Sequence, residues 1–150
     1  MSVYKFKMQS ILDIKAKLEE QSRQDFAVAA GRLIDEQNAL DELKARRQEY
    51  VEIGIALRNT TIDVLKIKEN KDAIDRMDEL IEKQELNVKV AEKEFEVARF
   101  KMMQARTQTK TYEKLKENDF EEFMHEEGIK ESKEIDQLNS YRSAQKADKK

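Results

Sequence analysis

The sequence predicts an all-α protein, a long antiparallel two-helix coiled-coil hairpin with an overhanging C-terminal helix, in a single domain over residues 1–150. Charged residues make up 41% of the chain and hydrophobic residues 39%, with 3 Gly and neither Pro nor Cys. Mixed charge with strong helix formers and few helix breakers is typical of coiled coils. Apolar residues also recur at alternating spacings of three and four, which places them on one helix face.

The first helix is expected over about residues 3–58. Its apolar residues share one heptad register: Met8, Leu12, Phe26, Ala29, Leu33, Leu40, Leu43, Tyr50 and Leu57. The same register contains polar or small residues: Lys15, Glu19, Ser22, Glu36, Arg47 and Gly54. Polar residues at such positions set the register of a coiled coil at some cost in stability. Ile11, Ile14 and Leu18 lie off the register and predict a wider buried stripe in the first turns.

A short turn is expected at about residues 58–61. Asn59 can adopt the left-handed conformation that ends a helix. Thr60 followed by Asp63 resembles a capping box, with Asp in place of the usual Glu, and Gly54 weakens the helix just before it. The alternative is one unbroken helix paired with a second copy of the chain. A hairpin can also open into a domain-swapped homodimer.

The second helix is expected over about residues 62–140, followed by a frayed tail at 141–150. Its seam residues repeat every seven positions: Ile67, Ile74, Ile81, Val88, Phe95 and Met102, with Met77, Ala91, Ala98 and Ala105 between them. The alanines allow the two helix backbones to approach closely. A turn near residue 60 predicts that Phe26 faces the region of Phe95.

The same pairing predicts that residues beyond about 117 overhang the open end of the hairpin. Tyr112, Leu115, Phe120, Phe123 and Met124 form an apolar patch there, and residues 117–136 carry nine acids and two bases. An unpaired amphipathic helix is typical of a segment that binds a partner. The alternative is that Phe120 and Phe123 fold back on Tyr4 and Phe6.

Residues that could carry chemistry are scarce, so we expect no enzyme and no cofactor. His125 stands alone among carboxylates, and Glu126 and Glu127 do not share a helix face because they are adjacent. The three glycines are isolated, which excludes a phosphate-binding loop. We predict no catalytic, cofactor or metal residue. Net charge of −3 with interspersed signs argues against nucleic acid, and no apolar run is long enough for direct membrane insertion.

The two ends of the chain resemble the FliJ family of the flagellar type III export apparatus. Residues 4–15, an aromatic and basic run leading into a Leu/Ile helix, are similar to the start of that family. Residues 112–117, followed by Phe120-Glu121-Glu122-Phe123 and by residues 134–136, are similar to its C-terminal signature. The resemblance covers about residues 3–142.

The resemblance implies a non-enzymatic coiled coil similar to the central stalk subunit of rotary ATPases. The implied partners are the hexameric export ATPase FliI, the export gate protein FlhA and the export chaperones, so that the protein links ATP hydrolysis to proton-driven export. It also implies a role in flagellum biogenesis, motility and chemotaxis, and a cytoplasmic location at the inner face of the cell membrane. The alternative is a generic coiled-coil module, such as a rotary-ATPase stalk or a chaperone-like hairpin.

Two partner-binding sites are predicted. The end that meets the ATPase ring comprises Tyr4, Phe6, Leu115, Phe120, Phe123 and Met124. The gate-binding patch, placed by the resemblance, comprises Leu43, Tyr50, Met77, Leu80 and Gln84, with Arg46 where some relatives have an aromatic residue. Leu43, Tyr50 and Met77 also fit the seam, so core packing is the alternative for them. Leu80 lies beside the seam and is expected to be exposed.

Overall fold

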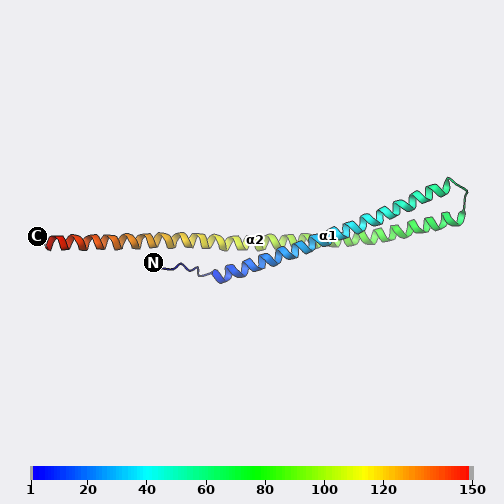
Figure 1. The fold of residues 1–150 in the computed structure, drawn as a ribbon. Coiled ribbons are helices and arrows are strands. Elements are labelled where there is room, and N and C mark those ends of the chain that lie inside the picture. The colour runs from blue at the N-terminus through cyan, green and yellow to red at the C-terminus, as the bar shows by residue number, and fades with distance from the viewer. Residues whose placement is uncertain (1, 149–150) are drawn as a thin grey trace. The chain divides into compact units, whose positions relative to one another are not determined.

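A computed structural model describes residues 2–148; Met1 and the last two residues of the predicted frayed tail lie outside the described residues. It contains two helices, α1 (Gln9–Arg58) and α2 (Val64–Asp148). These helices run antiparallel and pack against each other, which confirms the predicted two-helix hairpin (Figure 1).

The chain divides into two compact units, and each is described by itself. The turn unit is Glu20–Met103, and the end unit joins Met1–Glu19 to Gln104–Lys150. Both helices pass through both units, so the turn unit holds the connection between the helices. The end unit holds both ends of the chain.

The predicted heptad register forms the buried seam of both helices. On α1, every register position from Leu12 to Leu57 is buried or half-buried, polar positions included. On α2, the predicted seam residues from Ile67 to Ala105 are also buried or half-buried, and Ala91 is only 1% exposed. Phe26 faces Phe95 as expected, with ring centroids 5.1 Å apart.

Polar seam residues of the turn unit are paired across the two helices. The Gln84 side-chain amide donates to the backbone carbonyl of Glu36 at 2.9 Å and to its carboxylate at 2.5 Å. Arg47 Nε donates to Asp78 Oδ1 at 2.6 Å. Each bond joins one position of α1 to one position of α2. Sliding the helices by a turn would break both pairs, so these residues fix the register.

Gly54 has a packing role that its low helix propensity does not suggest. A Cβ at this position would collide with the side-chain oxygen of Asn70. The missing side chain lets Asn70 enter the seam, where its amide donates to the Tyr50 carbonyl at 2.8 Å. Gly54 and Asn70 therefore form a third cross-helix pair, in which one residue supplies the space and the other the hydrogen bond.

The end of α1 differs from the expectation. Asn59 does not adopt the left-handed conformation, because no residue in the described range has a positive φ. Instead, the Thr60 hydroxyl is within hydrogen-bonding distance of the carbonyls of Ala56 (3.3 Å) and Leu57 (3.4 Å). The last carbonyls of α1 are thus capped by a side-chain hydroxyl. After a left-handed residue, backbone N–H groups would cap them instead.

The predicted capping box is also wrong. Asp63 itself caps α2, because its carboxylate accepts the backbone N–H groups of Leu65 (3.1 Å) and Lys66 (3.4 Å). Asp is among the residues preferred at this position, and its negative charge suits the helix N-terminus. Thr60 and Asp63 therefore cap different helices, and the connection extends over residues 59–63 instead of 58–61.

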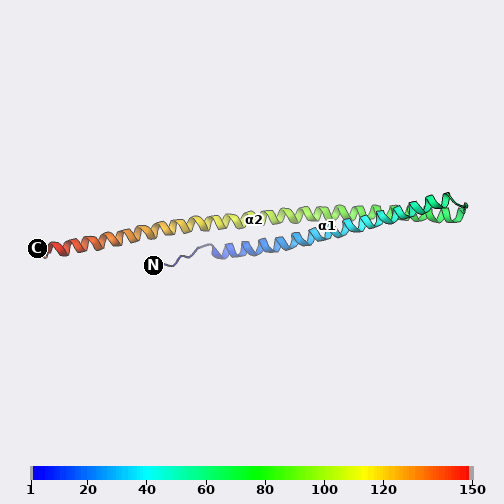
Figure 2. The ribbon, with the colours of Figure 1, turned by 45° about the horizontal axis from the view of Figure 1, so that its top comes forward.

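The first helix begins at Gln9, not near residue 3. Residues 2–8 form the non-helical trace that leads into α1 in Figure 2. Ile11, Ile14 and Leu18 are 40%, 57% and 51% exposed, so the expected wider stripe is also wrong. The single neighbouring helix covers only a narrow face of α1, and residues off the seam remain in contact with solvent.

The second helix continues to Asp148, past the predicted end near 140. The structure therefore has helix at residues 141–148, where the sequence analysis placed a frayed tail. This stretch has no Gly or Pro to stop a helix, and the Gln145 amide bonds the Tyr141 hydroxyl one turn earlier at 2.9 Å. Every side chain from Ile129 to Asp148 is nevertheless exposed.

Candidate partner-binding surfaces

The end unit contains an aromatic cluster built from both ends of the chain. The Tyr4 ring meets Phe120 edge-on, with centroids 5.1 Å apart, and Phe123 at 5.3 Å. Phe6 is buried, at 9% exposure. The sequence left two interpretations of this region, a free helix or a fold-back of Phe120 and Phe123 onto Tyr4 and Phe6. The structure has the contacts with Tyr4 that the second predicts, but they form because the N-terminal segment extends along a continuous α2 and not because α2 folds back. We call Tyr4, Phe6, Phe120 and Phe123 the aromatic cluster.

The Tyr4 hydroxyl anchors this cluster to α2. It donates to the carboxylate of Asp119 at 3.0 Å and lies 3.3 Å from the backbone carbonyl of Lys116. Desolvation raises the pKa of the Tyr4 phenol, and both the hydrogen bond to Asp119 and the negative charge of that carboxylate raise it further. The neutral phenol is thus the form that holds the N-terminal segment in place.

The overhang begins later than the sequence predicts. An extended chain advances about 3.3 Å per residue against about 1.5 Å for a helix, so residues 2–8 cover more of α2 than a helix would. Ser2 and Tyr4 line a shallow hollow on α2 together with Phe123, Met124, Glu127, Gly128 and Glu131. Residues beyond 117 therefore have a partner within the chain as far as this hollow.

Three predicted ring-end residues remain accessible around the cluster. Leu115 is 41% exposed, Phe120 45% and Met124 53%. Acidic side chains lie close by, because Glu127 and Glu131 line the hollow and Glu121 and Glu122 are exposed beside Phe120. The result is an apolar surface with a negatively charged border.

Polar contacts join the first turns of α1 to α2 within the end unit. The Thr109 hydroxyl, at 4% exposure, lies 3.1 Å from the backbone carbonyl of Lys15. The Lys15 ammonium donates to the side-chain carbonyl of Gln108 at 2.9 Å. These bonds set the position of the start of α1 on α2, from which residues 2–8 continue toward Phe120.

The predicted gate-binding residues all lie in the turn unit but differ in accessibility. Leu80 is 38% exposed and Met77 only 6%. Leu43 and Tyr50 are half-buried seam residues. Gln84 is half-buried, and its amide is occupied by the two bonds to Glu36. Met77 thus packs in the core, while Leu80 is the large apolar member of this set that a partner can reach directly.

A small hollow lies beside Leu43 on α1. Ala39, Glu42 and Arg46 line it with Leu43. Arg46 is exposed, whereas the neighbouring Arg47 is engaged with Asp78. A partner that reached Leu43 would therefore also meet the Arg46 guanidinium, a group suited to carboxylates and aromatic faces.

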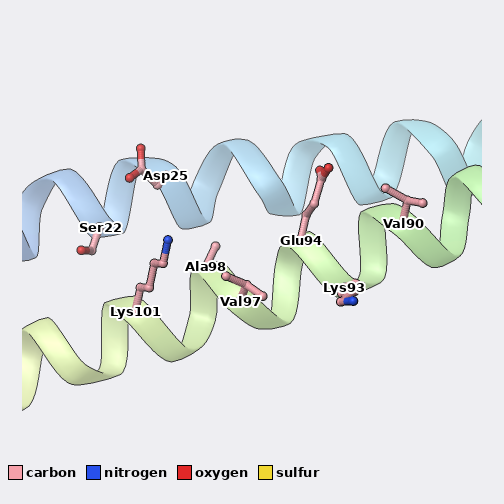
Figure 3. Close-up of a pocket in the computed structure, with 8 residues that line it drawn as sticks. All are labelled: Ser22, Asp25, Val90, Lys93, Glu94, Val97, Ala98 and Lys101. Atoms are coloured by element: carbon pink, nitrogen blue, oxygen red, sulfur yellow. The ribbon is translucent and has the colours of Figure 1, made fainter.

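The turn unit also has an apolar groove that the sequence analysis missed. Ser22 and Asp25 of α1 line it together with Lys101, Ala98, Val97 and Glu94 of α2 (Figure 3). The groove is hollow because the seam residues Ser22 and Ala98 are small. Val90 and Val97, seven residues apart and off the seam, are 52% and 46% exposed, and this second heptad stripe is the signal that could have revealed the groove.

The described residues offer no evident site for chemistry. No group of three or more His, Cys, Asp or Glu side chains among residues 2–148 could hold a metal ion. His125 is an exposed side chain on α2. No helix in this range is both long and apolar enough to cross a membrane.

Comparison with known proteins identifies the family. The family model described as flagellar FliJ protein matches residues 4–148. The chain belongs to the FliJ family. It is thus a component of flagellar or type III protein export. A solved structure of a YscO homolog from Chlamydia trachomatis is similar to it, with a TM-score of 0.77 and 24% identity over 99% of this chain and 100% of that one. No curated protein matches the chain.

Proposed function

We propose that this FliJ-family protein is a non-enzymatic, stalk-like component of the flagellar export machine. Its end unit binds the hexameric export ATPase FliI, and its turn unit binds the export gate protein FlhA. It thereby links ATP hydrolysis to export, handles export chaperones and works in the cytoplasm at the inner face of the cell membrane. The aromatic cluster and its exposed neighbours carry this proposal, because they form an organised, accessible apolar surface at one end of the hairpin.

The physical character of the end unit supports ATPase binding. Phe120 and Met124 are half-exposed, and the surfaces of partner-binding sites are enriched in such aromatic and Met residues. Tyr4 holds Phe120 and Phe123 in fixed positions, so less conformational entropy is lost when a partner binds. The acidic border favours a partner with basic residues and speeds its approach at low salt.

The turn unit supports gate binding through Leu80 and the hollow beside Leu43. These residues lie on α2 and α1 respectively, so a partner that touched both would recognise the paired hairpin in preference to a single helix. Core packing accounts for Met77, which leaves Leu80 as the residue to substitute. Its removal should affect binding more than folding because 38% of its surface is already exposed.

The experiment compares two charged substitutions at accessible apolar positions, Met124→Asp in the end unit and Leu80→Asp in the turn unit. Stimulation of ATP hydrolysis by the purified export ATPase is measured with the full chain at matched salt. Binding to the soluble part of the gate protein is measured by calorimetry. We expect Met124→Asp to reduce stimulation at least about tenfold with gate binding unchanged, and Leu80→Asp to do the reverse.

Each variant is the control for the other, and circular dichroism checks that both remain helical. Loss of both activities in both variants would mean that the substitutions disturb the hairpin and that the two surfaces are not separate. A charge reversal at Glu121 and Glu122 that left stimulation intact would exclude the acidic border from ATPase binding. A wild-type chain that is folded yet stimulates no ATPase would favour a generic coiled-coil module instead.

A further inference from the structure

The last five turns of α2 are helical although nothing in the described chain packs against them. All side chains from Ser132 to Asp148 are exposed. A helix of this length is marginal in water when it has no tertiary contacts. Its apolar residues are nevertheless arranged on one face, since Ile135, Leu138 and Tyr141 are 57%, 55% and 62% exposed and lie three residues apart. This face is suited to packing against another helix.

Residues on this face and beside it follow the spacing of a coiled-coil seam. Glu131, Ile135, Leu138, Arg142 and Gln145 are separated by alternating steps of four and three residues. The register of the seam with α1 carries no large apolar residue into this segment, because on that register the next positions are Lys130, Lys133, Gln137 and Ser140, followed only by the small Ala144 and Ala147. The terminal segment therefore presents a seam of its own, which we call the terminal seam (Glu131, Ile135, Leu138, Arg142 and Gln145).

Charge along the terminal seam is divided between its two halves. On and beside the seam, the acidic Glu131 and Glu134 lie before Leu138, and the basic Arg142 and Lys146 lie after it. Lys133 and Asp136 lie on the opposite face of the helix, and Lys130 and Asp148, on one flank, have the reverse order, which antiparallel pairing also brings together. Antiparallel pairing of two identical segments about Leu138 places Glu134 opposite Arg142 and Glu131 beside Lys146, twice over. Parallel pairing would place each of these charges opposite itself, which is unfavourable.

We propose that the terminal seam pairs antiparallel with the same segment of a second copy of this chain, on a two-fold axis at Leu138. Such an interface is isologous, since each copy contributes the same patch. Ile135 of one copy packs beside Tyr141 of the other, and the two Leu138 side chains meet on the axis. The buried apolar surface is small, so the dimer is weak, depends on concentration, and weakens further as salt screens the charges.

The experiment measures self-association of the full chain by sedimentation equilibrium over a range of concentrations at low salt. The Leu138→Asp variant is expected to weaken dimerisation at least about tenfold, because it places two like charges on the axis. The matched control is Ser140→Asp, which adds the same charge to the opposite face of the helix and should leave the dimer unchanged. Hydrogen exchange of residues 132–148 should slow with concentration in the control and not in the Leu138 variant.

Charge-reversed variants test the complementarity. Glu131→Lys with Glu134→Lys, and separately Arg142→Glu with Lys146→Glu, should each abolish self-association, while an equimolar mixture of the two should form heterodimers. Because the natural chain has no Cys, introduced thiols report the orientation. A mixture of Glu131→Cys and Gln145→Cys chains should form disulfides across the interface, and Glu131→Cys alone should not.

Three results would overturn the proposal. A chain that stays monomeric up to its solubility limit would show that no second copy binds, and a different partner would then cover this face. A dimer that resists Leu138→Asp would arise from opening and swapping of the hairpin instead. Disulfides in the Glu131→Cys chain alone would indicate a parallel arrangement. None of these readings depends on binding to the export ATPase or the gate.

Discussion

The turn unit and the end unit hold α2 in different ways. In the turn unit, α1 follows α2 residue for residue, and polar pairs such as Gln84–Glu36 and Arg47–Asp78 fix which positions meet. In the end unit, this helix pairing stops at the start of α1, and beyond it a non-helical segment contacts α2 through the ring and hydroxyl of Tyr4. Helix pairing gives a precise register over a long distance. Aromatic docking gives a local contact, and its residues belong to the end that is predicted to bind the ATPase ring.

The largest effect is expected from a charge in the seam of the turn unit. Val88 is 8% exposed, so Val88→Asp buries a carboxylate without a partner and should lower the free energy of unfolding by about 3 kcal/mol. The control is Leu86→Asp, two residues along α2 at 58% exposure, which should change it by less than about 0.5 kcal/mol. Urea unfolding followed by circular dichroism measures both. Equal effects would mean that the turn unit does not depend on its seam.

The Gly54–Asn70 pair allows a second test in the turn unit, because it joins the two helices through one residue that supplies space and one that supplies a hydrogen bond. Gly54→Ala alone should destabilise the hairpin by about 1 kcal/mol, since the Cβ displaces the Asn70 side chain and its bond to Tyr50 is lost. In an Asn70→Ala background the collision is absent. The same Gly54→Ala substitution should then stabilise by about 1 kcal/mol, because Ala has the higher helix propensity.

The decisive result for this pair is whether the effect of Gly54→Ala on the free energy of unfolding changes sign between the natural and the Asn70→Ala backgrounds. Urea unfolding of the four chains of the double-mutant cycle gives the coupling between the two positions. A stabilising Gly54→Ala in the natural background would show that Asn70 can turn aside at no cost. The two residues would then be neighbours without energetic coupling.

The seam could be predicted from sequence because it repeats. A residue such as Phe95 is placed by the whole series from Ile67 to Met102, so its neighbours along the helix support the assignment. The partner of Phe95 then followed from the position of the turn. Polar seam residues were located by the same register, although their partners were not, since hydrogen bonds such as Gln84–Glu36 depend on side-chain geometry that the register does not specify.

Features that occur once were predicted less well. Thr60 and Asp63 match a known capping pattern, yet each satisfies the nearer helix end because the chain between the helices is longer than the pattern assumes. The start of α1 was placed too early because residues 3–8 contain no helix breaker. The contacts of Tyr4 with α2 and the burial of Phe6 outweigh local helix propensity there. The accessibility of Leu80 was expected from its place beside the seam, whereas the groove at Val97 was missed.

A smaller effect is expected from detaching the N-terminal segment. Tyr4→Ala removes the ring contacts with Phe120 and Phe123 and the bond to Asp119, so residues 2–8 should leave α2 while the hairpin stays folded. Trypsin should then cut after Lys5 and Lys7 several-fold faster, with the urea midpoint nearly unchanged. The control is Tyr141→Ala, which removes an exposed ring. A large loss of global stability would show that the segment and the helices unfold together.

The smallest effect concerns the Tyr4 phenol, whose pKa is raised above its ordinary value of 10.0 first by desolvation and then by Asp119. Because the docked phenol holds its proton more tightly than the undocked one, its contribution to docking is fully present below pH 10.0 and is lost as the pH rises through the raised pKa. Subtracting the ultraviolet titration of a Tyr4→Phe chain from that of the natural chain isolates this tyrosine. Asp119→Asn should move its midpoint back toward 10.0 without reaching it, because desolvation, the largest cause, remains. A midpoint that did not move would mean that Asp119 does not raise the pKa of the docked phenol, and the hold of Tyr4 on α2 would then rest on its ring contacts and on the carbonyl of Lys116.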